Sequence, residues 1–91
     1  MNRTQMNKIA RRMIADIARD TDITSCEIGL PDCMRTFGIA PAHKRKRIYY
    51  RTAEELADLN EWVAACQSCH DKIEVDRKLT EDIFKVLRPL V

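Results

Sequence analysis

The feature that most constrains this chain is a pair of cysteines, Cys66 and Cys69, separated by two residues and followed at once by His70. Two thiols at this spacing can bind the same metal ion. A second pair, Cys26 and Cys33, lies upstream and brings the total to four thiols, the number that a closed tetrahedral zinc site requires. The sequence therefore predicts a structural zinc centre built from these four cysteines.

The upstream pair has an unusual spacing. Six residues separate Cys26 from Cys33, whereas about two to four are usual between paired zinc ligands. The loop must therefore fold back on itself to bring both sulfurs to one ion. Gly29 and Pro31 mark a tight reversal inside it.

The short length of the chain favours a cross-link of this kind. We expect a single domain, 1–91, whose apolar core is marginal without two disulfides or one metal site. No apolar run is long enough for a secretory signal or a membrane span, so we expect an intracellular, cytoplasmic protein with no membrane partner. Because paired cysteines in a reducing compartment hold metal more often than they form disulfides, zinc is favoured.

Three helices are expected from apolar residues at helical spacing. An amphipathic helix covers 2–20, a second covers 68–76, and a last helix covers 80–88 with Leu90 on the same apolar side. The second helix would begin at the downstream cysteine pair, where the helix dipole favours thiolates. The apolar faces of the terminal helices are either core or a docking surface for a protein partner.

The middle of the chain predicts shorter elements. A strand is expected near 38–43, ending at His43, and Thr52 with Glu55 fits a capping box for a short helix over 53–59. The apolar run 62–65 fits either a strand that pairs with the first or the start of the next helix. Together these elements predict a small α+β fold.

The distribution of charge is more informative than the net charge of +2. Five cations crowd one short stretch together with Tyr49 and Tyr50. The five cations are Lys44, Arg45, Lys46, Arg47 and Arg51. Such a run forms either a solvated face or a contact with phosphate, and its place beside a zinc knuckle and two tyrosines favours DNA as a partner.

The order of these pieces resembles a known family. A cysteine pair, Ala42-His43, Asn60-Glu61 and then Cys-x-x-Cys-His follow one another along 26–75. This order is similar to the zinc-bound branch of the HNH nucleases, the ββα-metal group, and in particular to its small phage-type members. The resemblance implies a zinc-stapled ββα-metal core, with the terminal helices outside it, in a bacterial or phage-infected cell.

The resemblance also implies roles for individual residues in a metal-dependent DNA endonuclease. His43 matches the general base that activates the attacking water, and His70 matches the ligand of a catalytic divalent ion such as Mg²⁺. Asn60 or Glu61 would orient the general base, since Asn60 has the usual residue type and Glu61 stands at the usual position.

One position departs from the family pattern. The residue before the first histidine is commonly an acidic or histidine ligand of the catalytic ion, and here it is Ala42. Glu61 is the best replacement ligand that the sequence offers. The alternative is a catalytically silent module of the same fold that binds nucleic acid or a protein partner.

A rival interpretation comes from Cys-x-x-Cys-His, which is also the attachment signature of c-type haem. It would require export of the chain and would leave Cys26 and Cys33 without a role. We therefore expect no haem.

Overall fold

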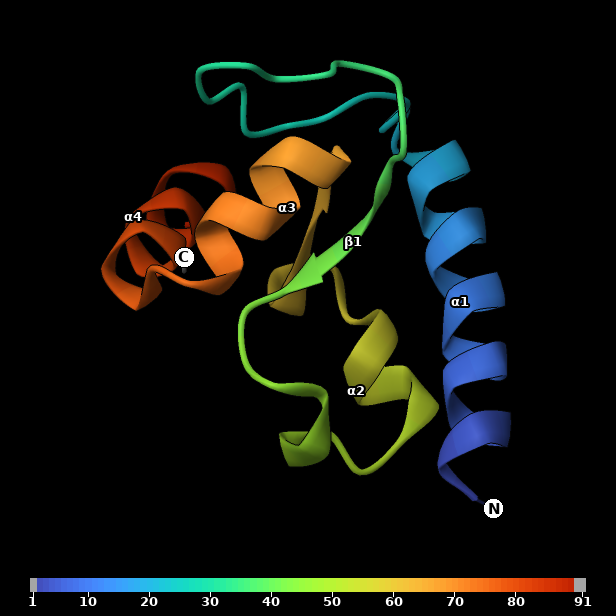
Figure 1. The fold of residues 1–91 in the computed structure, drawn as a ribbon. Helices are drawn as coiled ribbons and strands as arrows, with labels where there is room; N and C mark the ends of the chain where they lie inside the picture. The colour runs from blue at the N-terminus through green and yellow to red at the C-terminus, as the bar shows by residue number, and fades with distance from the viewer. Residues whose placement is uncertain (1, 90–91) are drawn as a thin grey trace.

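The computed structural model describes residues 2–89, which form four α-helices, two 3-10 turns and one two-stranded sheet (Figure 1). In chain order the elements are α1 (Arg3–Asp20), β1 (Ala40–His43), η1 (Arg47–Tyr49), α2 (Ala53–Ala57), η2 (Leu59–Glu61), β2 (Trp62–Ala65), α3 (Gln67–Glu74) and α4 (Arg77–Leu87). The predicted α+β class is confirmed. None of the helices in the described part is long and apolar enough to cross a membrane.

The two strands pair antiparallel, with His43 opposite Trp62. Every residue of β2 is buried, because helices cover both faces of this small sheet. Trp62 and Ala64 pack toward α1 and α2, whereas Val63 and Ala65 pack toward α3 and α4. A strand that is covered on both faces is apolar throughout and does not alternate apolar with polar residues. The two-residue period of a strand therefore could not be recognised in this part of the sequence.

The helices differ from the predicted ones mainly at their ends. Helix α1 covers all but the first residue of the predicted range because Asn2 is its cap, forming a reciprocal capping box with Gln5. Helix α4 begins three residues before the predicted start, since the side chain of Asp76 accepts a hydrogen bond from the Leu79 N–H at 3.0 Å. Leu90 lies outside the described residues.

The short elements were predicted too long. Strand β1 starts at Ala40 rather than at 38, because Gly38 adopts a φ of 65° that ends the preceding turn. Helix α2 ends at Ala57, since Asp58 leaves the helix and caps η2 through the N–H of Asn60. Helix α3 covers Gln67–Glu74, two residues short of the predicted end.

Candidate functional site

The four cysteines form one cluster. All four are free thiols, and their sulfurs lie within 4.8 Å of one another. A zinc ion bound at about 2.3 Å to four tetrahedral sulfurs sets them about 3.8 Å apart. The sulfurs of Cys33 and Cys66 lie 3.9 Å apart, close to that spacing. The cluster therefore fits a metal such as zinc, as the cysteine spacing predicted.

The long loop between the upstream cysteines folds back through a single turn. The N–H of Cys33 donates to the carbonyl oxygen of Leu30 at 3.0 Å, which places Pro31 and Asp32 at the corner of the turn. Pro31 is suited to the second position of such a turn, and Asp32 takes the left-handed φ of 68°. This turn brings the sulfur of Cys33 back toward that of Cys26.

Backbone N–H groups are aimed at the sulfur of Cys66. This sulfur accepts from the N–H of Met34 at 3.2 Å and from the N–H of Cys69 at 3.4 Å, and the second bond makes Cys66 the cap of α3. Burial alone would raise the pKa of the Cys66 thiol, but these donors outweigh it and lower that pKa to about 6. Burial and the neighbouring thiols raise the pKa of Cys69 to about 12. Backbone hydrogen bonds also lower the pKa of Cys26 against the effect of its burial, so the cluster favours thiolate at Cys26 and Cys66 and thiol at Cys69.

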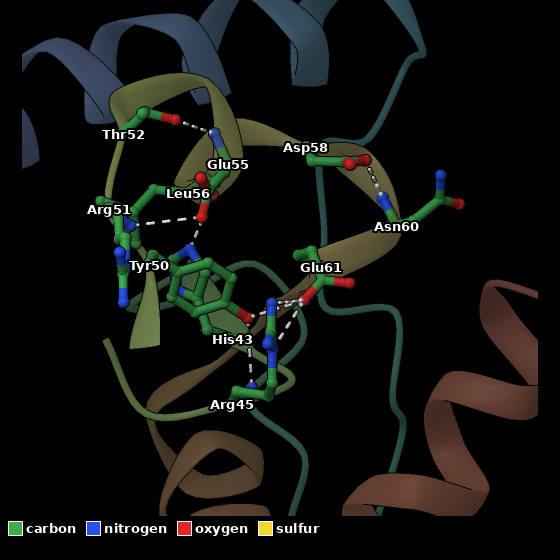
Figure 2. A network of polar contacts seen from close by, with 10 residues as sticks. All are labelled: His43, Arg45, Tyr50, Arg51, Thr52, Glu55, Leu56, Asp58, Asn60 and Glu61. Atoms are coloured by element: carbon green, nitrogen blue, oxygen red, sulfur yellow. Dashed lines mark hydrogen bonds and ion pairs between the residues drawn. The ribbon is translucent and has the colours of Figure 1, made fainter. Parts of the chain in front are cut away.

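His43 lies at the end of β1 with one ring nitrogen already engaged. Its Nε2 is 2.7 Å from the carbonyl oxygen of Leu56, so Nε2 carries the proton and donates it, and Nδ1 keeps its lone pair (Figure 2). The ring also packs against Tyr50, with centroids 5.3 Å apart. Burial lowers the pKa of His43 below its usual 6.5, and the nearby Arg47 lowers it further. This neutral imidazole has the protonation state that a general base needs.

The structure does not bring the two candidates for the middle motif position to His43. Asn60 is exposed and points away from the histidine (Figure 2). Glu61 accepts a hydrogen bond from the Tyr50 hydroxyl at 3.0 Å and pairs with Arg45 at 3.3 Å. Orientation of the ring comes instead from the Leu56 carbonyl and from the face of Tyr50, which sequence reasoning missed.

Tyr50 is fully buried between these groups and serves as their anchor. Its hydroxyl accepts from the Arg45 N–H at 3.2 Å while donating to Glu61, and the Arg45 guanidinium lies 4.9 Å from its ring centre (Figure 2). Burial raises the pKa of Tyr50, and the adjacent carboxylate adds to this effect. The hydroxyl therefore stays protonated and keeps the segment after β1 fixed.

His43 and His70 line the same cleft, which has a volume of about 770 Å³. The cleft is bounded by β1, the residues that follow it, α3 and the start of α4. Five cations, Lys44, Arg45, Lys46, Arg47 and Arg77, also line it.

A second group of candidate metal ligands lies on the α3 side of this cleft. His70, Asp71 and Glu74 each offer one ligand atom within 4.8 Å of the others. The Nδ1 of His70 is 3.8 Å from a carboxylate oxygen of Glu74, one helical turn further on. Of the two acids only Glu74 lines the cleft, whereas Asp71 is exposed and accepts a hydrogen bond from Gln67 at 2.8 Å. The i, i+4 spacing of His70 and Glu74 was a signal that the sequence analysis missed.

Ala42 lies beside His43 in β1 but faces the opposite side of the strand. It is 3% exposed, packs in the core with Val63, Ile73 and Phe84, and also borders the cleft. Glu61, the predicted replacement for a ligand at this position, is held by Tyr50 instead. Glu74 is the carboxylate that accompanies His70 in the cleft.

The basic run divides into paired and unpaired cations. Arg45 is engaged by Glu61, whereas no carboxylate of residues 2–89 lies within 4.0 Å of the charged groups of Lys44, Lys46, Arg47 or Arg51. Three of these four unpaired cations are in the cleft lining.

Comparison with known proteins identifies no relative of this chain. A scan of protein-family models, a search of curated proteins and a search of solved structures each return no match.

Proposed function

We propose that this protein is a metal-dependent DNA endonuclease of HNH type that hydrolyses a phosphodiester bond in the cleft between β1 and α3. The observation that carries the proposal is the meeting of His43 and His70 in one cleft whose lining is cationic. The strand–strand–helix order of β1, β2 and α3 and the adjacent cysteine cluster support it.

In the proposed reaction His43 acts through Nδ1. The oxygen of a water molecule forms the new bond to phosphorus, and Nδ1 takes the proton that this water loses. The bond from phosphorus to the leaving sugar oxygen breaks, and that oxygen leaves with the bonding electrons. The carbonyl of Leu56 holds Nε2–H, so the ring has a fixed orientation and one free lone pair.

His70 and Glu74 are the residues that would hold the catalytic ion. Imidazole and carboxylate together suit a divalent cation such as Mg²⁺ or Mn²⁺. Such an ion would neutralise charge that develops on the phosphate oxygens and the leaving oxygen. In this proposal Glu74 supplies the carboxylate that is missing at Ala42.

The unpaired cations would bind the DNA backbone. Contacts from Lys44, Lys46 and Arg47 to phosphates would release counterions, so DNA affinity should fall steeply as salt rises. Replacing these three residues by serine should weaken binding and flatten that dependence. Binding that is independent of salt would contradict this part of the proposal.

The test is nicking of a supercoiled plasmid by zinc-loaded protein, with Mg²⁺, Mn²⁺ or Ni²⁺ added in turn. His43→Ala should lower the nicking rate by about 10²–10⁴-fold. Glu74→Gln should raise the concentration of divalent ion needed for half-maximal nicking. Glu54→Gln, an exposed change on α2 outside the cleft lining, is the matched control and should leave both quantities unchanged.

A second candidate function is favoured by Ala42. Because this buried side chain offers no ligand atom, the same fold could serve as a catalytically silent module that binds nucleic acid or a protein partner. DNA binding without nicking under any added ion would select this alternative. Nicking that persists in His43→Ala would instead point to a contaminating nuclease.

A further inference from the structure

Ile48 and Tyr49 form an exposed apolar pair in the middle of the basic run. Their exposed fractions are 72% and 63%. Among the large apolar side chains that are exposed in residues 2–89, they are the only two that are neighbours in the sequence. Scattered apolar residues on a surface need no explanation, but an adjacent pair enclosed by cations on both sides does.

The turn that carries this pair is held rigidly by a residue from the far end of the chain. The guanidinium of Arg3 donates to three carbonyl oxygens of η1 and its flank, those of Arg47 at 3.0 Å, Ile48 at 3.3 Å and Tyr50 at 2.7 Å. The N–H of Tyr49 also donates to the carbonyl of Lys46 at 3.0 Å. The backbone of the pair is therefore fixed although both side chains face solvent.

The buried core beneath the turn, which contains Tyr50, also holds it in place. Tyr50, directly after the pair, is fully buried and bonded to Glu61, while Met6 and Ala10 of α1 pack in the same cluster. A side chain on a fixed backbone loses little conformational freedom on binding, so an exposed pair held in this way is suited to a contact made at low entropic cost.

The surroundings identify the chemistry of the ligand. Lys46 and Arg47 precede the pair and Arg51 follows it, and none of them has a carboxylate partner among the described residues. A ligand that satisfies these groups must combine regularly spaced negative charge with flat apolar surface. DNA combines phosphates with the faces of its bases, and apolar side chains flanked by cations are inserted between base steps in several architectural proteins.

We infer that Ile48 and Tyr49 form a wedge that inserts between the base pairs of a DNA duplex at the edge of the cleft. This inference rests on the proposed function, because it assumes that DNA is the ligand. Lys46 and Arg47 line the cleft and directly precede the wedge, so insertion would unstack a base step next to the phosphate that faces His43.

The experiment uses the full zinc-loaded chain and a duplex that contains 2-aminopurine, whose fluorescence rises when it loses stacking. Binding of the unaltered protein should raise this fluorescence. Tyr49→Ser should abolish the rise and weaken binding by between about fivefold and 150-fold, the range for one stacked aromatic side chain. Tyr49→Phe keeps the ring and should behave as the unaltered protein does.

Two further variants separate insertion from general surface effects. Phe37→Ser removes an aromatic ring that is 68% exposed on the turn after Cys33 and should leave binding unchanged. Arg3→Lys keeps the positive charge but replaces the planar guanidinium, whose two terminal nitrogens reach the three carbonyls, by a single ammonium nitrogen, so it should reduce the fluorescence rise.

The possible failures are distinguishable. If the protein binds and nicks DNA with no change in 2-aminopurine fluorescence, or if Tyr49→Ser binds as tightly as the unaltered protein, the wedge is excluded and the nuclease proposal stands. If the unaltered protein does not bind duplex DNA at all, both proposals fail.

Discussion

His43 illustrates how single contacts determine the chemistry of this chain at the scale of one residue. Its position at the end of a strand could be predicted from the sequence, but the group that orients it could not. That group is the carbonyl oxygen of Leu56, a backbone atom of a residue whose own side chain is apolar and buried. A backbone acceptor has no signature in the sequence, whereas Asn60 and Glu61 were candidates because of their residue type and their position relative to the family motif.

The first prediction concerns the pH dependence of nicking. A general base works only when deprotonated, and the lowered pKa of His43 keeps it deprotonated to lower pH than an ordinary histidine. The midpoint of the fall in rate at low pH should therefore lie below pH 6.5, the usual pKa of histidine. Single-turnover nicking measured from about pH 5.5 to 8 tests this. A midpoint at or above pH 6.5 would show that His43 is not buried in the active protein.

The second prediction concerns Glu27, whose carboxylate joins the loop after α1 to strand β2 and to the end of α4. One of its oxygens accepts from the Arg88 guanidinium at 2.9 Å and from the Ala64 N–H at 2.7 Å, and both side chains of the ion pair are less than 20% exposed. Glu27→Ala leaves a mostly buried guanidinium unpaired and should lower the free energy of unfolding by about 3–5 kcal/mol. Urea unfolding followed by the fluorescence of Trp62, the single tryptophan, measures this loss.

The control for Glu27 is an ion pair in solvent. Asp82 bonds Lys78 at 2.8 Å along α4, with more than half of each side chain exposed. Asp82→Ala should cost no more than about 0.5 kcal/mol, because an exposed pair on a helix contributes little. Equal losses in the two variants would mean that Glu27 is solvated.

At the scale of elements, the helices were the most predictable part because their caps and apolar stripes are local. Thr52 accepts from the Glu55 N–H as a capping residue should, but the Glu55 carboxylate turns to the N–H of Arg51 rather than completing the box. Strand β2 was ambiguous because its burial on both faces depends on two helices that lie far away in the sequence.

The third prediction concerns helix α4. Its Phe84 is 2% exposed and packs on the core that contains Ala42, Ile73 and two of the cysteines. Phe84→Ala should lower the free energy of unfolding by about 3–5 kcal/mol. Val86 on the same helix is 78% exposed, so Val86→Ala should change the free energy of unfolding by no more than about 0.5 kcal/mol. Similar midpoints in urea for both variants would show that α4 is not docked.

At the scale of the whole molecule, the cysteine cluster joins a long loop to helix α3. No helix or strand lies between Asp20 and Ala40, and the loop there meets the rest of the fold through its two cysteines, through Glu27 and through apolar side chains such as Ile28 and Leu30 that pack on the core. Its irregular course could not be predicted, since it depends on turn residues such as Asp32. The gathering of its two cysteines with Cys66 and Cys69 could be predicted, because four thiols suit one tetrahedral metal site.

The fourth prediction concerns metal removal. We expect about one zinc per chain, and because the apparent binding free energy of structural zinc is about 10–16 kcal/mol, a chelator should unfold the protein. Cys66→Ser should fold poorly even with zinc present, whereas Phe37→Ser in the exposed turn after Cys33 should fold normally. Elemental analysis and far-UV circular dichroism report these outcomes. A metal-free protein with an unchanged melting temperature would overturn the zinc centre.

The three bonds made by Arg3 have a practical consequence for anyone who produces this protein. The surface that we assign to DNA is anchored 44 residues away, by a side chain two positions from the first residue. An affinity tag or a trimmed N-terminus that disturbs the first turn of α1 would leave the cysteine cluster intact, and the preparation would still pass a test of folding and metal content. Its weak DNA binding would then be mistaken for a property of the protein, so tags belong at the other end.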